Sequence, residues 1–412
     1  MRPHTAIRPP LGWLLAALLG SAAAATAGVD VGAGDVREGY ERADYRTRSS
    51  ALTSPTGDGL DLASRAQTPP LGLPPLPGSL PPLRAEAVAL GRALFFDRRL
   101  SANGTLSCGM CHVPEQGFTQ NELRTPVGLE GRTVRRNAPS LYNVAYRPLL
   151  FHDGRETRLE NQIWSPLTAP NEMGNADRAA VLARLAGLDD YAERFATIYE
   201  AGLTAETLGD ALASYERSLL SGDSPFDRWY YGNDPAALTE EAKRGFEVFR
   251  SAGCSSCHTV GEQHARFTDD GFHNTGIGHR AAATKPPSRI QLAPGVFTDL
   301  TVTFDVPRLA DDGRFEVTGV EADRHRYRTP TLRNVAVTAP YMHDGSIPTL
   351  AAVVDYYDNG GAGVPGQDSR IRSLNLSAAD KTALVAFLRS LTSSDVNALA
   401  ADARSIAIGD HR

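Results

Sequence analysis

The chain is poor in cysteine, methionine and tryptophan, and each scarcity restricts what the protein can be. Its 412 residues include four cysteines, four methionines and three tryptophans. Four cysteines are too few for a disulfide scaffold of this length. Positive charge is not in surplus either, since 42 basic residues stand against 48 acidic ones, so the composition gives no support for nucleic-acid binding. With 42% hydrophobic and 22% charged residues, the sequence is that of a globular protein large enough for two or three domains.

Long hydrophobic runs are absent except near the N-terminus. Arg2 and Arg8 precede an apolar run over 11–25, and the small residues at 25–27 suit signal cleavage. This pattern predicts a secretory signal peptide over residues 1–27 and, in a bacterium, a periplasmic location. A membrane anchor is the alternative, but the run is short for a span, is diluted with alanine and is followed by no stop-transfer pattern. We therefore expect a protein that is not integral to the membrane.

The rest of the chain divides into a linker and two similar halves. Residues 28–82 show no helical or strand periodicity and end in a proline-rich stretch, which predicts an N-terminal strap or linker. After it, apolar residues recur at helical spacing before each of two cysteine pairs, and each half closes with an amphipathic helix that contains Arg-Ser-Leu. A turn-rich linker places the boundary near residue 235. We expect a mainly α fold with domains over 83–235 and 236–395, and a C-terminal tail over 396–412.

All four cysteines lie in two motifs of the form Cys-x-x-Cys-His. Two thiols one helical turn apart can add to the two vinyl groups of a haem, and the next imidazole then reaches the iron from one face. A structural zinc site is the alternative, but a histidine directly after both pairs, each in a copied helical unit, favours haem. We predict two tandem cytochrome c-like domains, each with one covalent haem c and with His112 or His258 as iron ligand. The attaching thiols are Cys108, Cys111, Cys254 and Cys257.

Further segments between about residues 83 and 395 carry a family resemblance. They are Leu94–Asp97, Arg136–Ser140, Asp153–Arg155, Phe272–Gly276, Thr329–Val335 and Pro340–Ser346. In this order, these segments resemble those of the bacterial diheme cytochrome c peroxidases and the related MauG-type enzymes. The resemblance implies a peroxide-dependent oxidoreductase in which the first haem reacts with hydrogen peroxide and the second stores electrons. It also implies a partner, either a small electron-donor cytochrome c or cupredoxin or a protein substrate, and it leaves a homodimer open.

The first haem is expected to be open on its distal face. No histidine or methionine lies between Val113 and Phe151, so the removable distal histidine of many family members is missing. Peroxide cleavage needs a group that moves a proton between the two oxygens. The resemblance implies that Glu172 is this catalytic group and that Gln162 and Pro166 line the same pocket. Without the resemblance, Glu172 would be interpreted as a solvated loop carboxylate.

The second haem is expected to have an unusual ligand. In the peroxidases a methionine lies fourteen residues after the position of His343, and here that residue is Tyr357. Tyrosine resembles the MauG branch, where a phenolate ligand stabilises high oxidation states. The alternative is that Met342 binds the iron and Tyr357 only packs in its helix. His343 and His273 match family histidines near the second haem, and we interpret them as partners of a propionate or of an iron ligand.

Two further expectations concern the region between the haems. His152 occupies the place of a tryptophan that lies between the haems in related enzymes. Imidazole is harder to oxidise than indole, so either another aromatic residue substitutes, direct tunnelling suffices, or His152 simply binds a propionate. The candidate aromatic residues are Tyr142, Tyr146 and Trp164. The resemblance also implies a Ca²⁺ ion between the haems, held by oxygen donors at Asn137, Thr338 and Pro340.

Two other classes of function remain open from the sequence. One is a diheme cytochrome that only transfers electrons, for which an open first haem and Glu172 would be needless. The other is a haem dioxygenase of the rubber-cleaving type, which shares the architecture but is usually longer. His279 and His325 fall in a loop-rich stretch without a pattern, and we assign them to the surface by default.

Overall fold

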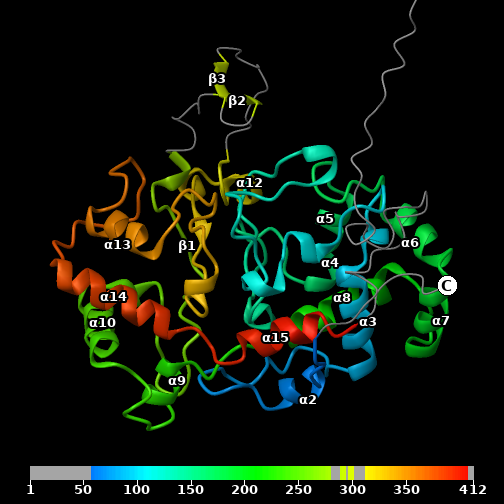
Figure 1. Ribbon diagram of the computed structural model, residues 1–412, viewed down its shortest axis with the longest axis horizontal. Coiled ribbons are helices and arrows are strands. Elements are labelled where there is room, and N and C mark those ends of the chain that lie inside the picture. Colours follow the sequence, from blue (N-terminus) through cyan, green and yellow to red (C-terminus); the bar gives the residue numbers. More distant parts are fainter. Residues whose placement is uncertain (1–56, 280–287, 294–295, 301–310, 407–412) are drawn as a thin grey trace, which may run out of the picture.

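The computed structural model describes residues 57–279, 288–293, 296–300 and 311–406, so the expected signal peptide lies outside the described residues. The fold is mainly α, as predicted, and Figure 1 shows helices on both sides of a central region of loops. Strands are short. β1 (Phe272–His273) pairs antiparallel with β4 (Tyr327–Arg328), and β2 (Ser288–Ala293) forms a hairpin with β3 (Val296–Leu300). None of the described helices is long and apolar enough to cross a membrane.

Buried apolar side chains form two main cores. Helices that contribute to the first core are α2 (Leu62–Gln67), α3 (Ala85–Phe96), α5 (Trp164–Thr168), α6 (Arg178–Ala186), α7 (Asp189–Ile198), α8 (Ala205–Ser218) and α15 (Val396–Ala403). Helices that contribute to the second core are α9 (Pro225–Tyr230), α10 (Glu240–Ser251), α13 (Leu350–Asp358) and α14 (Ala378–Ser390). Two short helices, α4 (Leu159–Gln162) and α12 (Phe315–Thr318), lie in the connecting segments. The second cysteine motif directly follows α10, whereas a 3-10 turn over Arg98–Leu100 and a loop separate the first motif from α3.

The central helix pairs of the two cores are built alike. α3 crosses α8 at Gly91, where the two helix backbones come close together. A Cβ on Gly91 would lie 1.9 Å from the Ala211 carbonyl oxygen. α10 crosses α14 in the same way, with Gly245 equally close to the Ala383 carbonyl oxygen. Glycine is therefore required at both crossings for the helices to approach this closely. The shared crossing supports the expectation that the halves are copies of one unit.

Two segments differ from the expectations. Part of the segment expected to lack helical periodicity forms α2, which Asp61 caps by accepting a hydrogen bond from the Ser64 amide. The segment after residue 395, expected only as a tail, forms α15, and Leu399 and Ala403 on this helix belong to the first core. Both helices are short, and packing against the core stabilises them where their own propensity would not.

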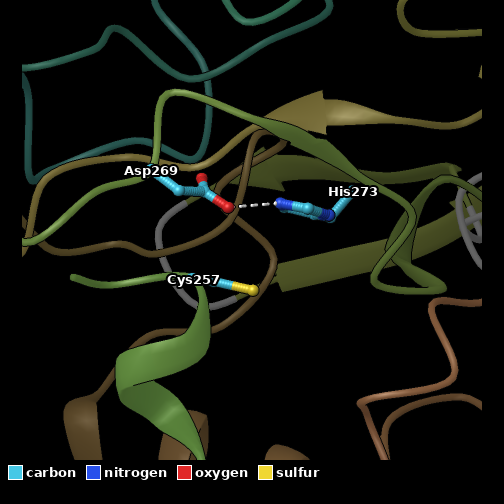
Figure 2. Close-up of side chains that lie close together, drawn as sticks. All are labelled: Cys257, Asp269 and His273. Atoms are coloured by element: carbon cyan, nitrogen blue, oxygen red, sulfur yellow. Dashed lines mark hydrogen bonds and ion pairs between the residues drawn. The ribbon is translucent and has the colours of Figure 1, made fainter.

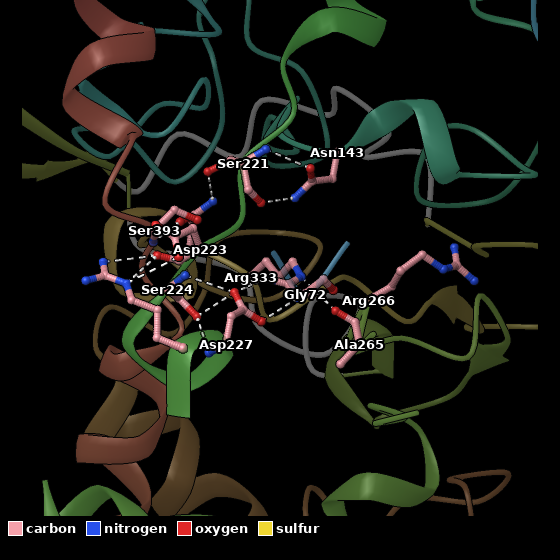
Figure 3. Close-up of polar contacts among 12 residues, drawn as sticks. Gly72, Asn143, Ser221, Asp223, Ser224, Asp227, Ala265, Arg266, Arg333 and Ser393 are labelled. Carbon is pink, nitrogen blue, oxygen red and sulfur yellow. Dashed lines mark hydrogen bonds and ion pairs between the residues drawn. The ribbon is translucent and has the colours of Figure 1, made fainter. Parts of the chain in front are cut away.

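The proline-rich stretch makes hydrogen bonds to segments of both halves of the chain. Gly72 is central: its carbonyl oxygen accepts from the Arg333 guanidinium at 2.6 Å and from the Ala265 amide at 3.1 Å. Arg333 also makes a two-pronged ion pair with Asp227 of α9, with N–O distances of 2.8 and 2.9 Å. Figure 3 shows these contacts converging on the Arg333 side chain. Two residues on, the Pro74 carbonyl oxygen accepts from the Tyr146 hydroxyl at 2.7 Å, which ties the strap to the other half of the chain.

Candidate functional site

The first motif, residues 108–112, folds as a short 3-10 turn over Cys108–Met110. The His112 amide donates to the Cys108 carbonyl oxygen at 2.9 Å and closes the turn. The imidazole Nδ1 of His112 lies 3.0 Å from the Phe118 carbonyl oxygen, which can only accept, so Nδ1 carries the proton. Nε2 therefore keeps its lone pair free for a metal, which is the tautomer that a haem ligand needs.

The second motif, residues 254–258, repeats this geometry. A 3-10 turn covers Cys254–Ser256, and the His258 amide donates to the Cys254 carbonyl oxygen at 3.0 Å. Nδ1 of His258 lies 2.9 Å from the Phe267 carbonyl oxygen. Phe267 and its counterpart Phe118 both have left-handed backbone angles, with φ of 53° and 52°. In both motifs the histidine therefore has Nε2 free to bind a metal.

The thiols of both motifs fit covalent haem attachment better than the zinc alternative. All four cysteines are free of disulfides. Among the described residues, the only group of three metal-ligating side chains of the His, Cys, Asp and Glu type is Cys257, Asp269 and His273, whose ligand atoms lie within 4.8 Å of one another (Figure 2). Because this group contains a single cysteine, the described residues do not form a zinc site from the four cysteines.

His273 lies beside the second motif, at the end of β1. Its Nε2 is 2.9 Å from the Asp269 carboxylate and its Nδ1 is 3.0 Å from the Asp368 carboxylate. A hydrogen bond to the Cys257 thiol and the bond to Asp269 raise the pKa of His273 to about 9, although burial opposes this. Carboxylates thus engage both ring nitrogens, as expected for a residue that supports the site without binding iron. Its role there stays a prediction.

Glu172 lies in the loop after α5 and is held from two sides. Its amide donates to the Ala169 carbonyl oxygen at 3.0 Å, and its own carbonyl oxygen accepts from the Leu129 amide at 2.9 Å. The overlying loop approaches so closely that a Cβ on Gly128 would lie 2.1 Å from the Asn171 carbonyl oxygen. Glycine at 128 is therefore required for this contact, which fixes the backbone around Glu172.

The Glu172 carboxylate interacts electrostatically with the first motif. Burial raises the pKa of Glu172, and the charge of Arg155 offsets part of this rise. Burial also raises the pKa of the Cys111 thiol to about 11, and the charge of Glu172 adds to this rise. The Pro166 carbonyl oxygen accepts at 3.0 Å from the amide of the residue after Glu172, and Gln162 ends α4 just before α5. The three predicted catalytic residues thus come from one short stretch of connected helices and loop.

Tyr357 lies near the C-terminal end of α13, and this helix packs in the same core as the second motif. Leu350 and Val354 of α13 belong to the second core, against which Cys254 also packs. Burial raises the pKa of the Tyr357 phenol, and Tyr356 and the Cys254 and Cys257 thiols raise it further. Met342 packs in the same apolar cluster as Tyr357, in a loop with φ of 75°. The choice between the two ligands therefore stays a prediction.

The buried junction between the two halves contains His152, His343 and one aromatic residue that the sequence analysis missed. His152 Nε2 lies 2.9 Å from the Asn137 carbonyl oxygen, and the Asn137 amide donates to the His343 carbonyl oxygen at 2.7 Å. Burial lowers the pKa of His152 to about 3 and that of His343 to about 4, so both are neutral near pH 7. The His343 ring stacks on Tyr327, with centroids 3.5 Å apart and planes at 10°. Tyr327 lies in no periodic pattern, so no sequence signal could have identified it.

The predicted calcium residues lie along the same junction. Asn137 contacts the segment that contains Thr338 and Pro340 through its bond to His343, and its side-chain amide donates to the Arg124 carbonyl oxygen at 3.0 Å. Thr338 uses its hydroxyl group to donate to the Val335 carbonyl oxygen at 3.2 Å. A site built from such scattered oxygens stays a prediction. His325, assigned to the surface by default, is instead 8% exposed, and its ring lies 4.2 Å from that of His279.

A cavity between the halves is lined by four arginines. They are Arg147, Arg266, Arg328 and Arg333. Arg266 and Arg333 are paired with carboxylates, whereas Arg147 and Arg328 bond to main-chain carbonyl oxygens and have no carboxylate partner within the described ranges. Burial and the nearby charge of Arg328 lower the pKa of Arg147 to about 9. Asp270, which pairs with Arg266, is the carboxylate that lines this cavity, and its charge acts on Arg147 and Arg328 without an ion pair. One carboxylate among four arginines leaves a cationic cavity that fits the carboxylates of a haem.

Glu216 in α8 is a further buried acid that the sequence analysis did not single out. It is 6% exposed, and its Oε2 atom has no hydrogen-bond partner in the described part of the chain. A signal was present: Glu216 follows Leu212 by one helical turn and therefore lies on the apolar face of its helix. An acid on such a face is rare unless it is paired or serves a site.

Comparison with known proteins places these features in one family. Residues 85–235 match the family model described as di-haem cytochrome c peroxidase, and residues 326–358 match one described as RoxA-like, cytochrome c-like. The methylamine utilization protein MauG of Methylorubrum extorquens is 37% identical over 313 residues, which cover 75% of this chain and 79% of the relative. The cytochrome c peroxidase Ccp of Escherichia coli is 35% identical over 280 residues, which cover 68% of this chain and 54% of the relative.

Solved structures agree with the sequence comparison. A MauG-like protein associated with microbial copper homeostasis superposes with a TM-score of 0.62 at 31% identity, covering 80% of this chain and 94% of that protein. The diheme peroxidase BthA from Burkholderia thailandensis superposes with a TM-score of 0.59 at 26% identity, covering 79% of this chain and 88% of that protein. The likeness therefore extends over both cores and both motifs.

Proposed function

Because this chain belongs to the di-haem cytochrome c peroxidase and MauG family of oxidoreductases, we propose that it is a diheme enzyme that reacts with hydrogen peroxide in the periplasm. The observation that carries the proposal is the pair of matching motifs, in each of which a carbonyl oxygen holds Nδ1 and leaves Nε2 for iron. In this proposal, residues 83–235 and 236–395 form two tandem haem domains. The reaction partner is a small cytochrome c or cupredoxin that donates electrons, or another protein that is oxidised.

The chain contributes the means to bind and orient the cofactors. A bound haem supplies an iron that exchanges electrons with peroxide and with a partner. Cys108 and Cys111 hold the first haem, and His112 binds its iron through Nε2. The unpaired guanidinium groups of Arg147 and Arg328 bind haem carboxylates in the cavity between the halves, which removes the cost of two buried cations.

Glu172 holds and returns the proton that peroxide cleavage requires. Cleavage of the O–O bond needs a base that takes a proton from one oxygen and an acid that returns it to the other. Burial raises the pKa of Glu172 above that of a free glutamate, which makes the carboxyl group a better proton acceptor. Gln162 and Pro166 shape the same pocket and limit how peroxide is oriented. The absence of histidine and methionine between Val113 and Phe151 leaves the first haem open to peroxide.

Tyr357 binds the second iron in this proposal. A buried phenol with a raised pKa ionises only beside a strong positive centre, which a ferric iron provides. Phenolate disfavours the reduced iron, whereas thioether favours it. A Tyr357 ligand therefore makes the second haem a poor store of electrons and favours oxidation of another protein over simple removal of peroxide. Asn137, Thr338 and Pro340 hold the Ca²⁺ ion between the haems through oxygen atoms.

Glu172→Gln tests the proposal. The variant keeps the size and polarity of the side chain but cannot exchange a proton, so its reaction with peroxide is expected to slow by about 10²- to 10⁴-fold. Stopped-flow absorbance of the purified, haem-loaded protein measures this rate. Glu200→Gln, at an exposed glutamate of the same half, is the matched control and keeps the parent rate. Equal rates in Glu172→Gln and the parent would show that Glu172 moves no proton.

A second candidate function has one observation in its favour. Residues 326–358 match the RoxA-like model, and this stretch includes both Tyr327 and Tyr357. A haem dioxygenase of the rubber-cleaving type would cleave an apolar polymer with O₂ and without added peroxide. Incubating the purified protein with polyisoprene under O₂ and analysing the products by mass spectrometry distinguishes the two functions.

A further inference from the structure

A buried polar cluster lies between α8 and α4, and the proposed function does not use it. Arg217 of α8 donates to a Glu160 carboxylate oxygen at 2.6 Å, and Glu216 follows on the same helix. Arg217 is 4% exposed and Glu216 is 6% exposed. One oxygen of each glutamate and two nitrogens of Arg217 have no hydrogen-bond partner within the described residues. Since the guanidinium group is bonded to Glu160, Glu216 is the surplus acid of the cluster.

The other half of the chain lacks this cluster. The matching crossings at Ala211 and Ala383 align α8 with α14, and this alignment pairs Glu216 with Leu388. Leu388 is buried and belongs to the second core. The arginine after it, Arg389, aligns with Arg217 but is exposed, whereas Arg217 is buried. The buried acid therefore belongs only to the half that carries the first motif, and simple helix packing does not require it.

The helix that carries Glu216 packs beside the first motif. The ring of Tyr215 on α8 lies 6.2 Å from that of Phe96, and a Cβ on Gly109 of the motif would lie 2.4 Å from the same Phe96 ring. Burial raises the pKa of the Cys108 thiol, and the charge of Glu216 adds to this rise. The charged groups that face Glu216 are Arg217 on its own helix and Arg147 in the arginine-lined cavity. Burial raises the pKa of Glu216 to about 8, and these two cations only limit the rise. Near neutral pH the side chain is therefore mostly protonated, next to the expected haem.

We infer that Glu216 is the group that couples proton uptake to reduction of the first haem. One electron that enters the haem is balanced by one proton that binds the Glu216 carboxylate from solvent, and oxidation releases both. The physical basis is that an added negative charge raises the proton affinity of a nearby acid in a medium of low dielectric constant. The inference rests on the proposed function only in requiring a haem attached at Cys108 and Cys111.

A redox titration at several pH values tests this inference. In the parent protein the potential of the first haem is expected to fall as pH rises through the range around the Glu216 pKa of about 8. The steepest slope corresponds to the uptake of one proton for each electron. One proton per electron corresponds to about 59 mV for each tenfold change in proton concentration. Glu216→Gln keeps the shape of the side chain but cannot titrate, so this slope is lost. The second haem serves as the internal control, and its titration is the same in both proteins.

Glu160→Gln provides a second, independent variant. Removing the charge of Glu160 frees Arg217 to pair with Glu216, which lowers the pKa of Glu216 and moves the sloping range to lower pH. A slope that persists in Glu216→Gln overturns the inference. If Glu216→Gln does not fold, the inference is overturned when the potential of the first haem changes over the same pH range in Glu160→Gln as in the parent. A protein that carries both haems but does not react with peroxide would refute the proposed function and leave this titration fully interpretable.

Discussion

Replacing Arg333 with methionine is expected to weaken the junction between the two halves far more than the loss of an exposed ion pair would. Arg333 is fully buried and pairs with Asp227 through two bonds of 2.8 and 2.9 Å. It also donates to the carbonyl oxygens of Gly72 and Ala265, at 2.6 and 2.7 Å. One side chain therefore joins the strap, α9 and the loop after the second motif.

The magnitude follows from burial. Methionine has a similar length but no charge, so Asp227 would remain buried without its cation, which costs about 3–5 kcal/mol. Arg244 and Asp380 form the matched control, because their ion pair also has an N–O distance of 2.8 Å but both side chains reach solvent. Arg244→Met is expected to cost about 0–1 kcal/mol. The two variants share one substitution and one bond length, so burial is the variable that separates them.

Urea unfolding followed by circular dichroism measures the difference. With a slope of about 3 kcal/mol per molar urea, a loss of about 3–5 kcal/mol lowers the midpoint by about 1 to 1.7 M. Arg244→Met should move the midpoint by about 0.3 M or less. Equal shifts in the two variants would refute the argument that Arg333 holds the halves together through a desolvated pair.

Further outcomes are expected at the second haem, the junction and the calcium site. Tyr357→Met should raise the reduction potential of the second haem in a redox titration, whereas Met342→Leu should leave it unchanged; the reverse pattern would make Met342 the ligand. Burial alone would raise the pKa of Asp311, but the hydrogen bonds and charge of Arg136 lower it. Its contribution to stability is therefore present above the pKa of an unfolded aspartate and is lost as pH falls, so Asp311→Asn should make the urea midpoint less sensitive to acid. Asn137→Ala should lower the calcium content that elemental analysis finds in the purified protein, and an unchanged content would exclude Asn137 as a ligand.

Much of the chemistry could be predicted from the sequence because covalent haem attachment imposes a strict local spacing. The order Cys-x-x-Cys-His is set by the distance between two vinyl groups and an iron, so five residues suffice to reveal it. The helical halves were also predictable, since apolar residues recur at helical spacing before both motifs. The mainly α fold is accordingly confirmed, and membership of the peroxidase family is confirmed by the comparisons.

Contacts between distant segments could not be predicted in this way. Arg147 and Arg328 lie far apart in the sequence, and only the packing of the two halves places both at one cavity. Tyr327 and His343 stack because their segments meet at the junction, and no sequence pattern around either residue predicts this contact. Glu216 is an intermediate case. Its position on the apolar face of a helix was visible, but its electrostatic effect on Cys108 depends on how α8 crosses α3.

The position of α15 makes the first core depend on a segment from the far end of the described chain. Leu399 and Ala403 of this helix complete the first core, and Asp402 binds both the Leu60 amide at 2.7 Å and the Arg92 guanidinium. The first core, which packs against Cys108, is therefore built from both ends of the described chain, and it is complete only when the last described helix has packed onto it.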